Sequence, residues 1–231
     1  MSSVLLGVDT TTEACSVALF DGNEMHTHRF LNTREHVVKL LPMVQELLAS
    51  TETPRHALDC IVFTRGPGSF SGCRIGTAAA QAMGYALDRP LVAVSTLETL
   101  AEGAKRELGT TRVATAIDAR MGQVYWACYA RVGSAWQEQI AESVCDPADV
   151  AAPDSANWVG VGSGWAAHGE ALRSSCPSVL RQFDKQLPDA RDSVMLALPR
   201  YRRGEVVSAA HAEPVYLRDK VALTTAERAG Q

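Results

Sequence analysis

The chain lacks the residue spacings that hold metal ions or build disulfide frameworks. Its six cysteines include no C-x-x-C pair, and its six histidines include no H-x-x-x-H or H-E-x-x-H pair. These absences argue against a structural or catalytic metal site. Most of the cysteines stand in apolar runs, which is typical of reduced thiols in a cytoplasmic protein.

The chain also lacks the common nucleotide-binding motifs, although it contains a glycine-rich loop at residues 65–72. This loop stands between an apolar run that predicts a strand and a run of small residues that predicts a helix, where backbone N–H groups can bind an anion. However, no lysine occurs between Lys39 and Lys105, so the NTPase motif G-x-x-x-x-G-K-[ST] is absent. Ser71 breaks the G-x-G-x-x-G pattern, and the G-x-S-x-G motif of hydrolases does not occur.

Positive charge and long apolar runs are scarce as well. The formal net charge is −4 and the sequence pI is about 5.9, so tight nucleic-acid binding by a basic surface is not expected. The basic cluster at residues 200–203 is typical of a solvated helix end. The first apolar run, residues 4–8, ends at Asp9 and is too short for a signal peptide or a membrane span.

What is present is the pattern of an ordinary globular chain of one or two domains, with 231 residues, 46% hydrophobic and 21% charged. Apolar runs predict strands at residues 4–8, 14–20, 24–30, 60–64, 91–94, 113–117, 123–131 and 158–161. Periodicity and capping patterns predict helices at residues 37–48, 73–87, 95–108 and 188–203. Pro42 is expected to kink or interrupt the first helix, and residues 141–156 are expected to form a polar connection.

A weak internal repeat indicates two lobes. Asp9 and Asp118 lie 109 positions apart (118 − 9), and each ends an apolar strand that precedes a hairpin. The sequence therefore predicts an α/β fold of the actin-like or ribonuclease-H-like (ASKHA) kind, with two lobes of mixed sheets flanked by helices. We expect residues 1–109 to form the N-terminal lobe and residues 110–231 to form the C-terminal lobe.

Two strand ends carry candidate binding residues. Asp9 and the hydroxyl residues after it resemble the first phosphate motif of actin-like ATPases and sugar kinases, but Thr11 stands where that motif usually has glycine. The alternative is that Asp9 accepts hydrogen bonds from local backbone amides. Asp118 and Arg120 stand near the expected cleft between the lobes, where they could bind a ligand or pair with each other. The glycine cluster at residues 160–164 fits either a tight loop or an adenosine contact.

The central helix carries a stripe of small residues. Gly72, Gly76, Ala80 and Gly84 recur every four positions, and glycine inside a helix costs about 1 kcal/mol relative to alanine. A second backbone close to this stripe would offset the cost. That backbone belongs either to the protein's own sheet or to a helix of another chain. Val38 and Met43 widen the apolar face of the preceding helix, which favours a partner surface.

Four long motifs identify a resemblance that runs from about Val4 to Arg218. They are GVDTTTEACSVAL at residues 7–19, RGPGSFSGCRIG at 65–76, AIDARMGQVYWA at 116–127 and HAEPVYLR at 211–218. In this order they resemble the TsaB (YeaZ-type) family, the accessory proteins of bacterial tRNA threonylcarbamoyladenosine biosynthesis. The glycine-rich loop departs from the usual family form only in Ser71, where threonine is common, and in Cys73, where an aliphatic residue is common.

The resemblance implies a non-catalytic accessory subunit. Such a chain pairs with a TsaD-type catalytic subunit, a TsaE-type ATPase joins them, and threonylcarbamoyl is transferred to N6 of the adenosine next to the anticodon. It implies no cofactor of the chain's own, ATP and metal bound by the partner subunits, tRNA contact only through the complex, and a possible homodimer in isolation. The implied partner interface lies on the N-terminal helices and includes Val38, Met43, Gly72, Gly76, Ala80, Met83 and Gly84.

Two enzymatic alternatives remain open. A small-molecule kinase of the same superfamily would need an intact phosphate hairpin and a second phosphate loop, and residues 118–120 lack the Gly-Thr pair of that loop. A peptidase that acts on its partner would need a metal set or a recognisable triad, and the spacing of residues shows neither.

Overall fold

The computed structural model describes residues 3–32, 35–154 and 157–218. The first lobe contains a five-stranded sheet in the order β3-β2-β1-β4-β5. Strands β1 to β3 are antiparallel neighbours, whereas β4 and β5 extend the sheet in parallel from β1. Its elements are β1 (Leu5–Asp9), β2 (Ala14–Phe20), β3 (Met25–Leu31), α1 (His36–Ser50), η1 (Arg55–Ala57), β4 (Cys60–Gly66), α2 (Phe70–Leu87) and β5 (Leu91–Ser95).

The second lobe repeats this topology, with the sheet order β10-β9-β6-β7-β8. Read from the other end this is β8-β7-β6-β9-β10, which matches the first sheet strand for strand. The remaining elements are α3 (Thr96–Leu108), β6 (Arg112–Arg120), β7 (Gln123–Val132), β8 (Ala135–Cys145), β9 (Trp158–Val161), α4 (Ser163–Ser175), β10 (Val179–Phe183), α5 (Ala190–Arg202) and η2 (Ala209–His211). The predicted two-lobe fold of mixed sheets is confirmed, and Asp9 and Asp118 stand on equivalent strands.

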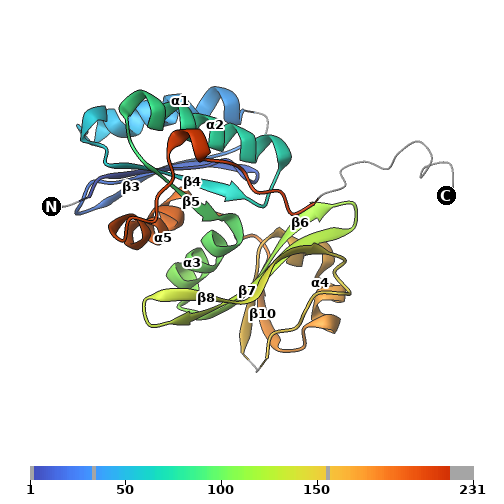
Figure 1. Ribbon diagram of the computed structural model, residues 1–231. Coiled ribbons are helices and arrows are strands. Elements are labelled where there is room, and N and C mark those ends of the chain that lie inside the picture. Colours follow the sequence, from blue (N-terminus) through green and yellow to red (C-terminus); the bar gives the residue numbers. More distant parts are fainter. Residues whose placement is uncertain (1–2, 33–34, 155–156, 219–231) are drawn as a thin grey trace, which may run out of the picture.

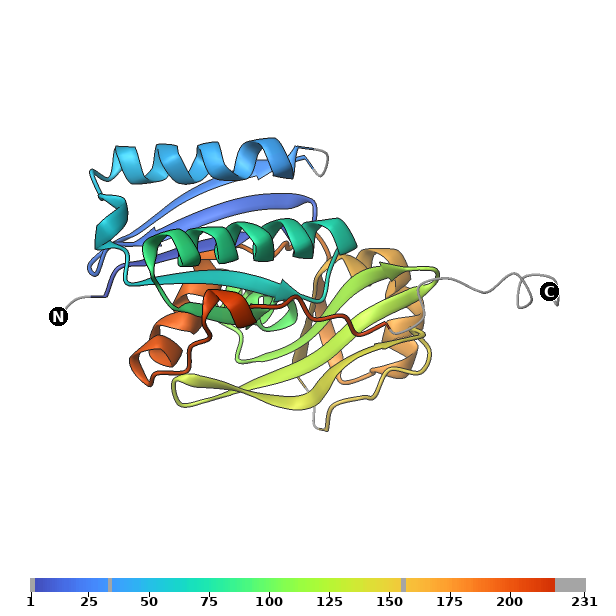
Figure 2. The same ribbon diagram turned by 45° about the horizontal axis from the view of Figure 1, so that its top comes forward.

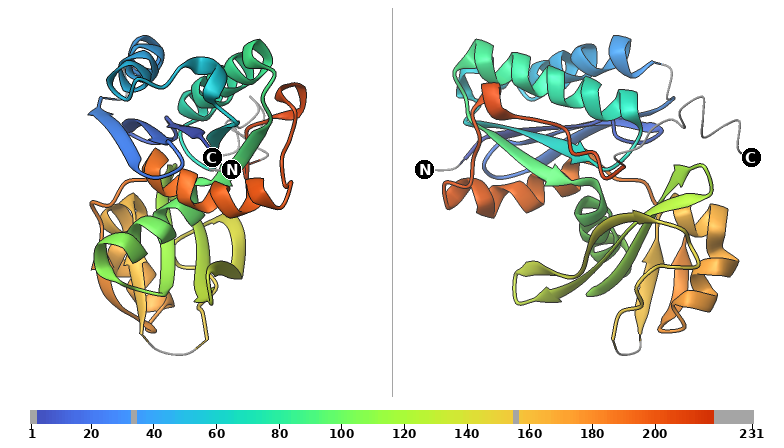
Figure 3. Two further views of the ribbon diagram at one scale, coloured as in Figure 1. Left: turned by 90° about the vertical axis from the view of Figure 1, so that its left-hand side faces the viewer. Right: turned by 45° about the vertical axis from the view of Figure 1, so that its right-hand side comes forward.

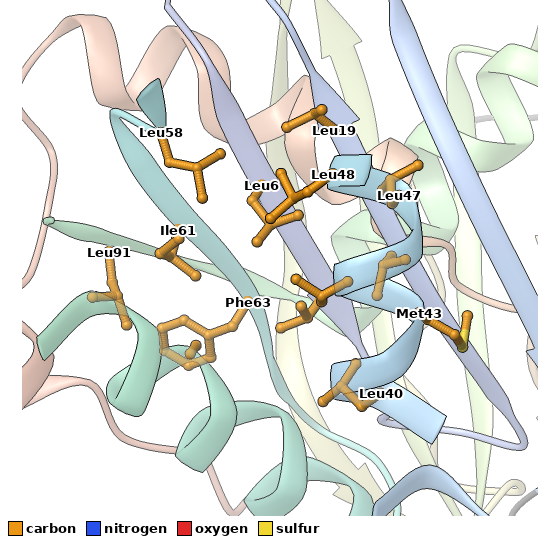
Figure 4. Close-up of a cluster of buried hydrophobic side chains, with 14 of the residues drawn as sticks. Leu6, Leu19, Leu40, Met43, Leu47, Leu48, Leu58, Ile61, Phe63 and Leu91 are labelled. Atoms are coloured by element: carbon orange, nitrogen blue, oxygen red, sulfur yellow. The ribbon is translucent and has the colours of Figure 1, made fainter. Parts of the chain in front are cut away.

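Each sheet is covered by helices on both faces. Leu6 of β1 packs toward α1 and α2 in one hydrophobic cluster, and its neighbour Leu5 packs toward α5 in another, as the period of a strand requires. Figure 4 shows the first of these clusters, in which side chains of α1 lie over those of the strands. In the second lobe Ala114 faces α4, and Val113 faces α3.

The two lobes exchange helices across the predicted boundary after residue 109. Helix α3 precedes that boundary but packs on the second sheet, and α5 follows it but packs on the first sheet. Figure 1 shows both helices between the two sheets. They contact each other through Arg106, which donates to both carboxylate oxygens of Asp192 at 2.8 and 2.9 Å, and through an ion pair between Arg200 and Glu98.

Local sequence explains most helix boundaries. Ser95 caps α3 by accepting hydrogen bonds from the backbone N–H groups of Leu97 and Glu98, as predicted. Helix α1 continues through Pro42, contrary to the expected interruption. The missing N–H of Pro42 deprives only the carbonyl of Val38 of its helical partner, and Val38 is exposed to water. Across the described part of the chain, none of the helices has both the length and the apolar composition of a membrane span.

Candidate functional site

A cleft of about 640 Å³ lies between the two lobes. Its walls come from the β1–β2 turn, the start of α2, the β6–β7 hairpin, the start of α4 and the C-terminal segment. Ligands of open α/β folds commonly bind at such an edge, where strands end. Its wall includes the side chains of Thr11, Ser69, Phe70, Asp118, Arg120, Met121, Tyr216 and Arg218.

Asp9 is buried behind this cleft and does not line it. One of its carboxylate oxygens, Oδ1, accepts hydrogen bonds from the backbone N–H and the Oγ1 hydroxyl of Thr11, each at 2.8 Å. The other oxygen, Oδ2, has no hydrogen-bond partner among the described residues. Burial raises the pKa of Asp9, and the hydrogen bonds from Thr11 act in the opposite direction. Asp9 therefore fixes the β1–β2 turn, as the alternative interpretation proposed, while Thr11 reaches the cleft wall.

The glycine-rich loop closes over the turn that would bind phosphate in a kinase. The backbone N–H of Ser69 donates to the carbonyl of Thr11 at 2.7 Å, and Thr10 Oγ1 donates to the carbonyl of Gly72 at 2.6 Å. A Cβ atom added to Gly68 would lie 2.4 Å from the Thr11 carbonyl oxygen, so the loop needs glycine for this approach. Ser69 Oγ accepts from the backbone N–H of Gly72 and caps α2. The backbone N–H groups of Ser69 and Gly72 are thus hydrogen-bonded within the protein.

Asp118 and Arg120 pair with each other on the opposite wall. Arg120 donates to Asp118 from its backbone N–H at 2.9 Å and from its guanidinium at 3.0 Å. His168 Nε2 lies 3.6 Å from Asp118 Oδ1. Asp118 and Arg120 therefore pair with each other, which was the alternative to ligand binding. The Arg120 side chain is 86% exposed.

The C-terminal segment supplies site residues that the spacing of residues in the sequence did not predict. Tyr216 accepts a hydrogen bond from Arg74 Nε at 2.8 Å, and the Arg74 guanidinium lies 3.6 Å from the centre of the Phe70 ring. Arg218 donates to Oε1 of Gln123, a residue of β7 in the second lobe, at 2.9 Å. The HAEPVYLR motif was the only available signal, since no spacing in the sequence connects these residues to the cleft.

The glycines at the start of α4 are explained by close packing. A Cβ atom at Gly162 would lie 2.4 Å from the carbonyl oxygen of Ala116, and one at Gly164 would lie 2.7 Å from Ala116 Cβ. Trp165 Nε1 donates to the carbonyl of Ala114 at 3.0 Å and fixes α4 on β6. The tight-loop interpretation of residues 160–164 accounts for this geometry.

The thiols and potential metal ligands do not form a reactive group in the described residues. Burial raises the pKa of Cys73 and Cys60 to about 12 each and that of Cys15 to about 11, so these thiols stay protonated at neutral pH. No cluster of three or more His, Cys, Asp or Glu side chains with metal-binding geometry occurs in the ranges 3–32, 35–154 and 157–218.

The predicted interface residues divide into buried and accessible sets. Gly72, Gly76, Ala80 and Gly84 are buried against the protein's own sheet, where added Cβ atoms at the three glycines would approach Thr10 or Leu91. The stripe therefore packs against the protein's own backbone and side chains, and it is not an exposed surface. Met43 is also buried, together with Leu40 and Leu47 on the same face of α1 (Figure 4).

Val38 and Met83 remain accessible on the outer side of α1 and α2, which lie side by side over the first sheet (Figure 2). Val38 is 64% exposed, and Met83 is only partly buried. A groove between the helices is lined almost entirely by apolar side chains, including Leu41, Met83 and Ala86.

Comparison with known proteins assigns the family. The family model TsaD, described as tRNA N6-adenosine threonylcarbamoyltransferase, matches residues 30–226. The chain is 43% identical over 222 residues to the tRNA threonylcarbamoyladenosine biosynthesis protein TsaB of Escherichia coli, covering 94% of this chain and 96% of that protein. It is 37% identical over 227 residues to TsaB of Haemophilus influenzae, covering 94% of each.

A solved structure agrees with this assignment. The chain is similar to YeaZ from Pseudomonas aeruginosa, with 43% identity, a TM-score of 0.87 and coverage of 93% of this chain and 100% of that one. The matches to the two TsaB proteins and to YeaZ cover nearly the whole length of the chain. The chain therefore belongs to the TsaB family of tRNA threonylcarbamoyladenosine biosynthesis proteins.

Proposed function

We propose that this chain is a non-catalytic accessory subunit that binds a TsaD-type catalytic subunit, together with a TsaE-type ATPase. The complex transfers threonylcarbamoyl from threonylcarbamoyl-AMP to N6 of the tRNA adenosine next to the anticodon. ATP and metal are bound by the partner subunits, and tRNA is contacted through the complex. The observation that carries this proposal is the exposed apolar groove between α1 and α2.

The groove has the composition of a helix-binding surface. Val38 and Leu41 are 64% and 48% exposed, and Val37 and Tyr85 are also exposed on these two helices. Leu41 lines the groove, whereas Val37, Val38 and Tyr85 are exposed elsewhere on the same two helices. Exposed apolar residues on neighbouring helices are typical of protein interfaces. The interface proposed here keeps Val38 and Met83 from the sequence prediction and adds Val37, Leu41 and Tyr85. It leaves out Met43 and the small-residue stripe, because those residues are buried within the lobe.

The cleft supports an accessory role over the kinase alternative. A kinase needs backbone amides of the first hairpin free to hold phosphate, whereas here the backbone N–H of Thr11 donates to Asp9 Oδ1. The glycine-rich loop also bonds the Thr11 carbonyl and the Thr10 hydroxyl of the same hairpin. Asp118 is paired with Arg120, and the buried thiols stay protonated. These features favour a function through binding.

The proposal is tested by introducing one charged side chain into the groove. Leu41→Asp should weaken the complex with the TsaD-type subunit at least about 100-fold, because burial of a leucine contributes about 1.5–3 kcal/mol and an unpaired carboxylate adds a desolvation cost. Binding is measured by light-scattering chromatography and titration calorimetry. The matched control is Leu180→Asp, the same change at a 63% exposed leucine of β10 in the second lobe.

Loss of the complex with Leu41→Asp, and its retention with Leu180→Asp, would support the proposal. Equal binding by both variants would refute this interface. If the isolated chain self-associates through the same groove, the molar mass measured for the isolated Leu41→Asp variant will be lower than that of the parent.

A further inference from the structure

The C-terminal segment after α5 runs along the first lobe and ends at the second. After η2, the carbonyl of Ala212 accepts a hydrogen bond from Gln81 of α2 at 2.8 Å, and the backbone N–H of Val215 donates to the carbonyl of Arg65 at 2.8 Å. Figure 2 shows this segment in red, passing beside α2 toward the tip of the β6–β7 hairpin. The segment is thus fixed to the first lobe as far as residue 216.

Tyr216 completes this attachment. Its ring centre lies 5.6 Å from that of Phe70, and Arg74 contacts both rings while donating its Nε–H to the tyrosine hydroxyl. Such cation–π contacts add to the hydrogen bond and orient the side chain. Two residues later, the chain leaves the surface of the first lobe.

Arg218 binds the second lobe at that point. Its guanidinium donates to Gln123 Oε1 at 2.9 Å and to the carbonyl of Arg120 at 3.3 Å, and it lies 3.6 Å from the sulfur of Met121. Arg120 and Met121 have φ of +62° and +56°, left-handed values that cost about 1–2 kcal/mol for residues other than glycine. Arg218 therefore contacts the strained turn at Arg120 and Met121.

From this geometry we infer that Tyr216 and Arg218 form an interlobe latch that fixes the width of the cleft. Further polar connections between the lobes are the α3–α5 contact, with its ion pairs at Arg106 and Arg200, and an ion pair between Arg65 of β4 and Glu142 of β8 at 3.0 Å. Rotation about the α3–α5 contact changes the distance between the start of α2 and the β6–β7 hairpin. The latch is bound to Arg74 on one side and to Gln123 on the other, so its contacts must break before the cleft widens. The second view of Figure 3 shows the red segment running from the first lobe toward the second.

The inference is independent of the proposed function and is tested on the isolated chain. Spin labels are placed at Ser71→Cys in α2 and Glu170→Cys in α4, both exposed positions on opposite lobes. Cys145, the one native cysteine that is not fully buried, is replaced by serine. Distances between the labels are measured by pulsed dipolar spectroscopy for the parent, for Arg218→Ala, and for Arg202→Ala, a matched control at an exposed arginine of α5.

Arg218→Ala should broaden the distance distribution and shift it to longer values, while Arg202→Ala should leave it unchanged. Hydrogen exchange of the amides at residues 120–123 should accelerate about tenfold in Arg218→Ala, the factor expected when a hydrogen bond to a charged group is lost. An unchanged distribution in Arg218→Ala would overturn the inference. Equal broadening in both variants would overturn it as well, because the effect would not be specific to the latch.

Discussion

Gly72→Ala tests whether the small-residue stripe serves the protein's own core. Gly72 lies in the first turn of α2 and is buried. An added Cβ atom would lie 2.0 Å from the carbonyl oxygen of Thr10 and 2.6 Å from Ser69 Oγ. The first of these atoms belongs to the backbone and cannot rotate away. The β1–β2 turn and the start of α2 must therefore move apart.

The expected cost follows from three contributions. Alanine is favoured over glycine by about 1 kcal/mol inside a helix. Overpacking of a tight contact costs about 1–3 kcal/mol. Loss of the hydrogen bond from Thr10 Oγ1 to the carbonyl of Gly72 adds about 1 kcal/mol. The net loss is about 2 kcal/mol, which corresponds to a decrease in melting temperature of about 4–8 °C for a chain of this size.

The assay is urea unfolding followed by circular dichroism, with Gly169→Ala as a matched control in α4. A Cβ atom at Gly169 would lie 3.2 Å from the end of the flexible Arg173 side chain, so this variant should be as stable as the parent or up to about 1 kcal/mol more stable. A Gly72→Ala chain with undiminished stability would refute the packing argument. It would also return the stripe to consideration as a partner surface.

Two further substitutions test buried charges. Arg106→Met should lower the free energy of unfolding by about 2–3 kcal/mol, less than the loss of about 3–5 kcal/mol for a fully buried pair because Arg106 is partly exposed. Urea unfolding would show this loss, and an unchanged midpoint would contradict it. Burial raises the pKa of Asp9, so the folded chain holds this proton more tightly than the unfolded chain, and stability falls as pH rises from about 3.8 through the folded-state pKa. Asp9→Asn should flatten that fall in unfolding measured between about pH 4 and about pH 7, and an identical slope in both chains would count against it.

Strong local patterns made much of the fold predictable. Strand β2 and helix α3 have the predicted boundaries within one residue. An apolar run broken only by Ser16 defines the strand, and the Ser95 cap defines the start of the helix. The repeat of Asp9 and Asp118 correctly indicated two equivalent lobes. Strand β8 was missed because none of its residues is buried and polar side chains are mixed with apolar ones along it, so a predicted connection at 141–156 replaced its second half.

Tertiary contacts decided what the sequence could not. Helix α4 is rich in small residues and has no clear apolar period, so neither it nor β10 was predicted. Spacing showed that a backbone approaches the stripe on α2 but not whose backbone it is. In the cleft, Thr11, Asp118 and Arg120 were found from strand ends. Arg218 was not, because its partner Gln123 lies 95 positions away in the sequence.

The central claim is that the chain acts by assembly and has no catalytic step of its own. The most direct measurement mixes the chain with its TsaD-type partner, separates the complex by light-scattering chromatography, and assays tRNA modification on the same fractions with the TsaE-type ATPase added. The account predicts a complex of the two chains, with modified adenosine formed only when the chain, TsaD and TsaE are all present. Modification at an undiminished rate without this chain, or ATP turnover by the pure chain that Asp9→Asn abolishes, would contradict it.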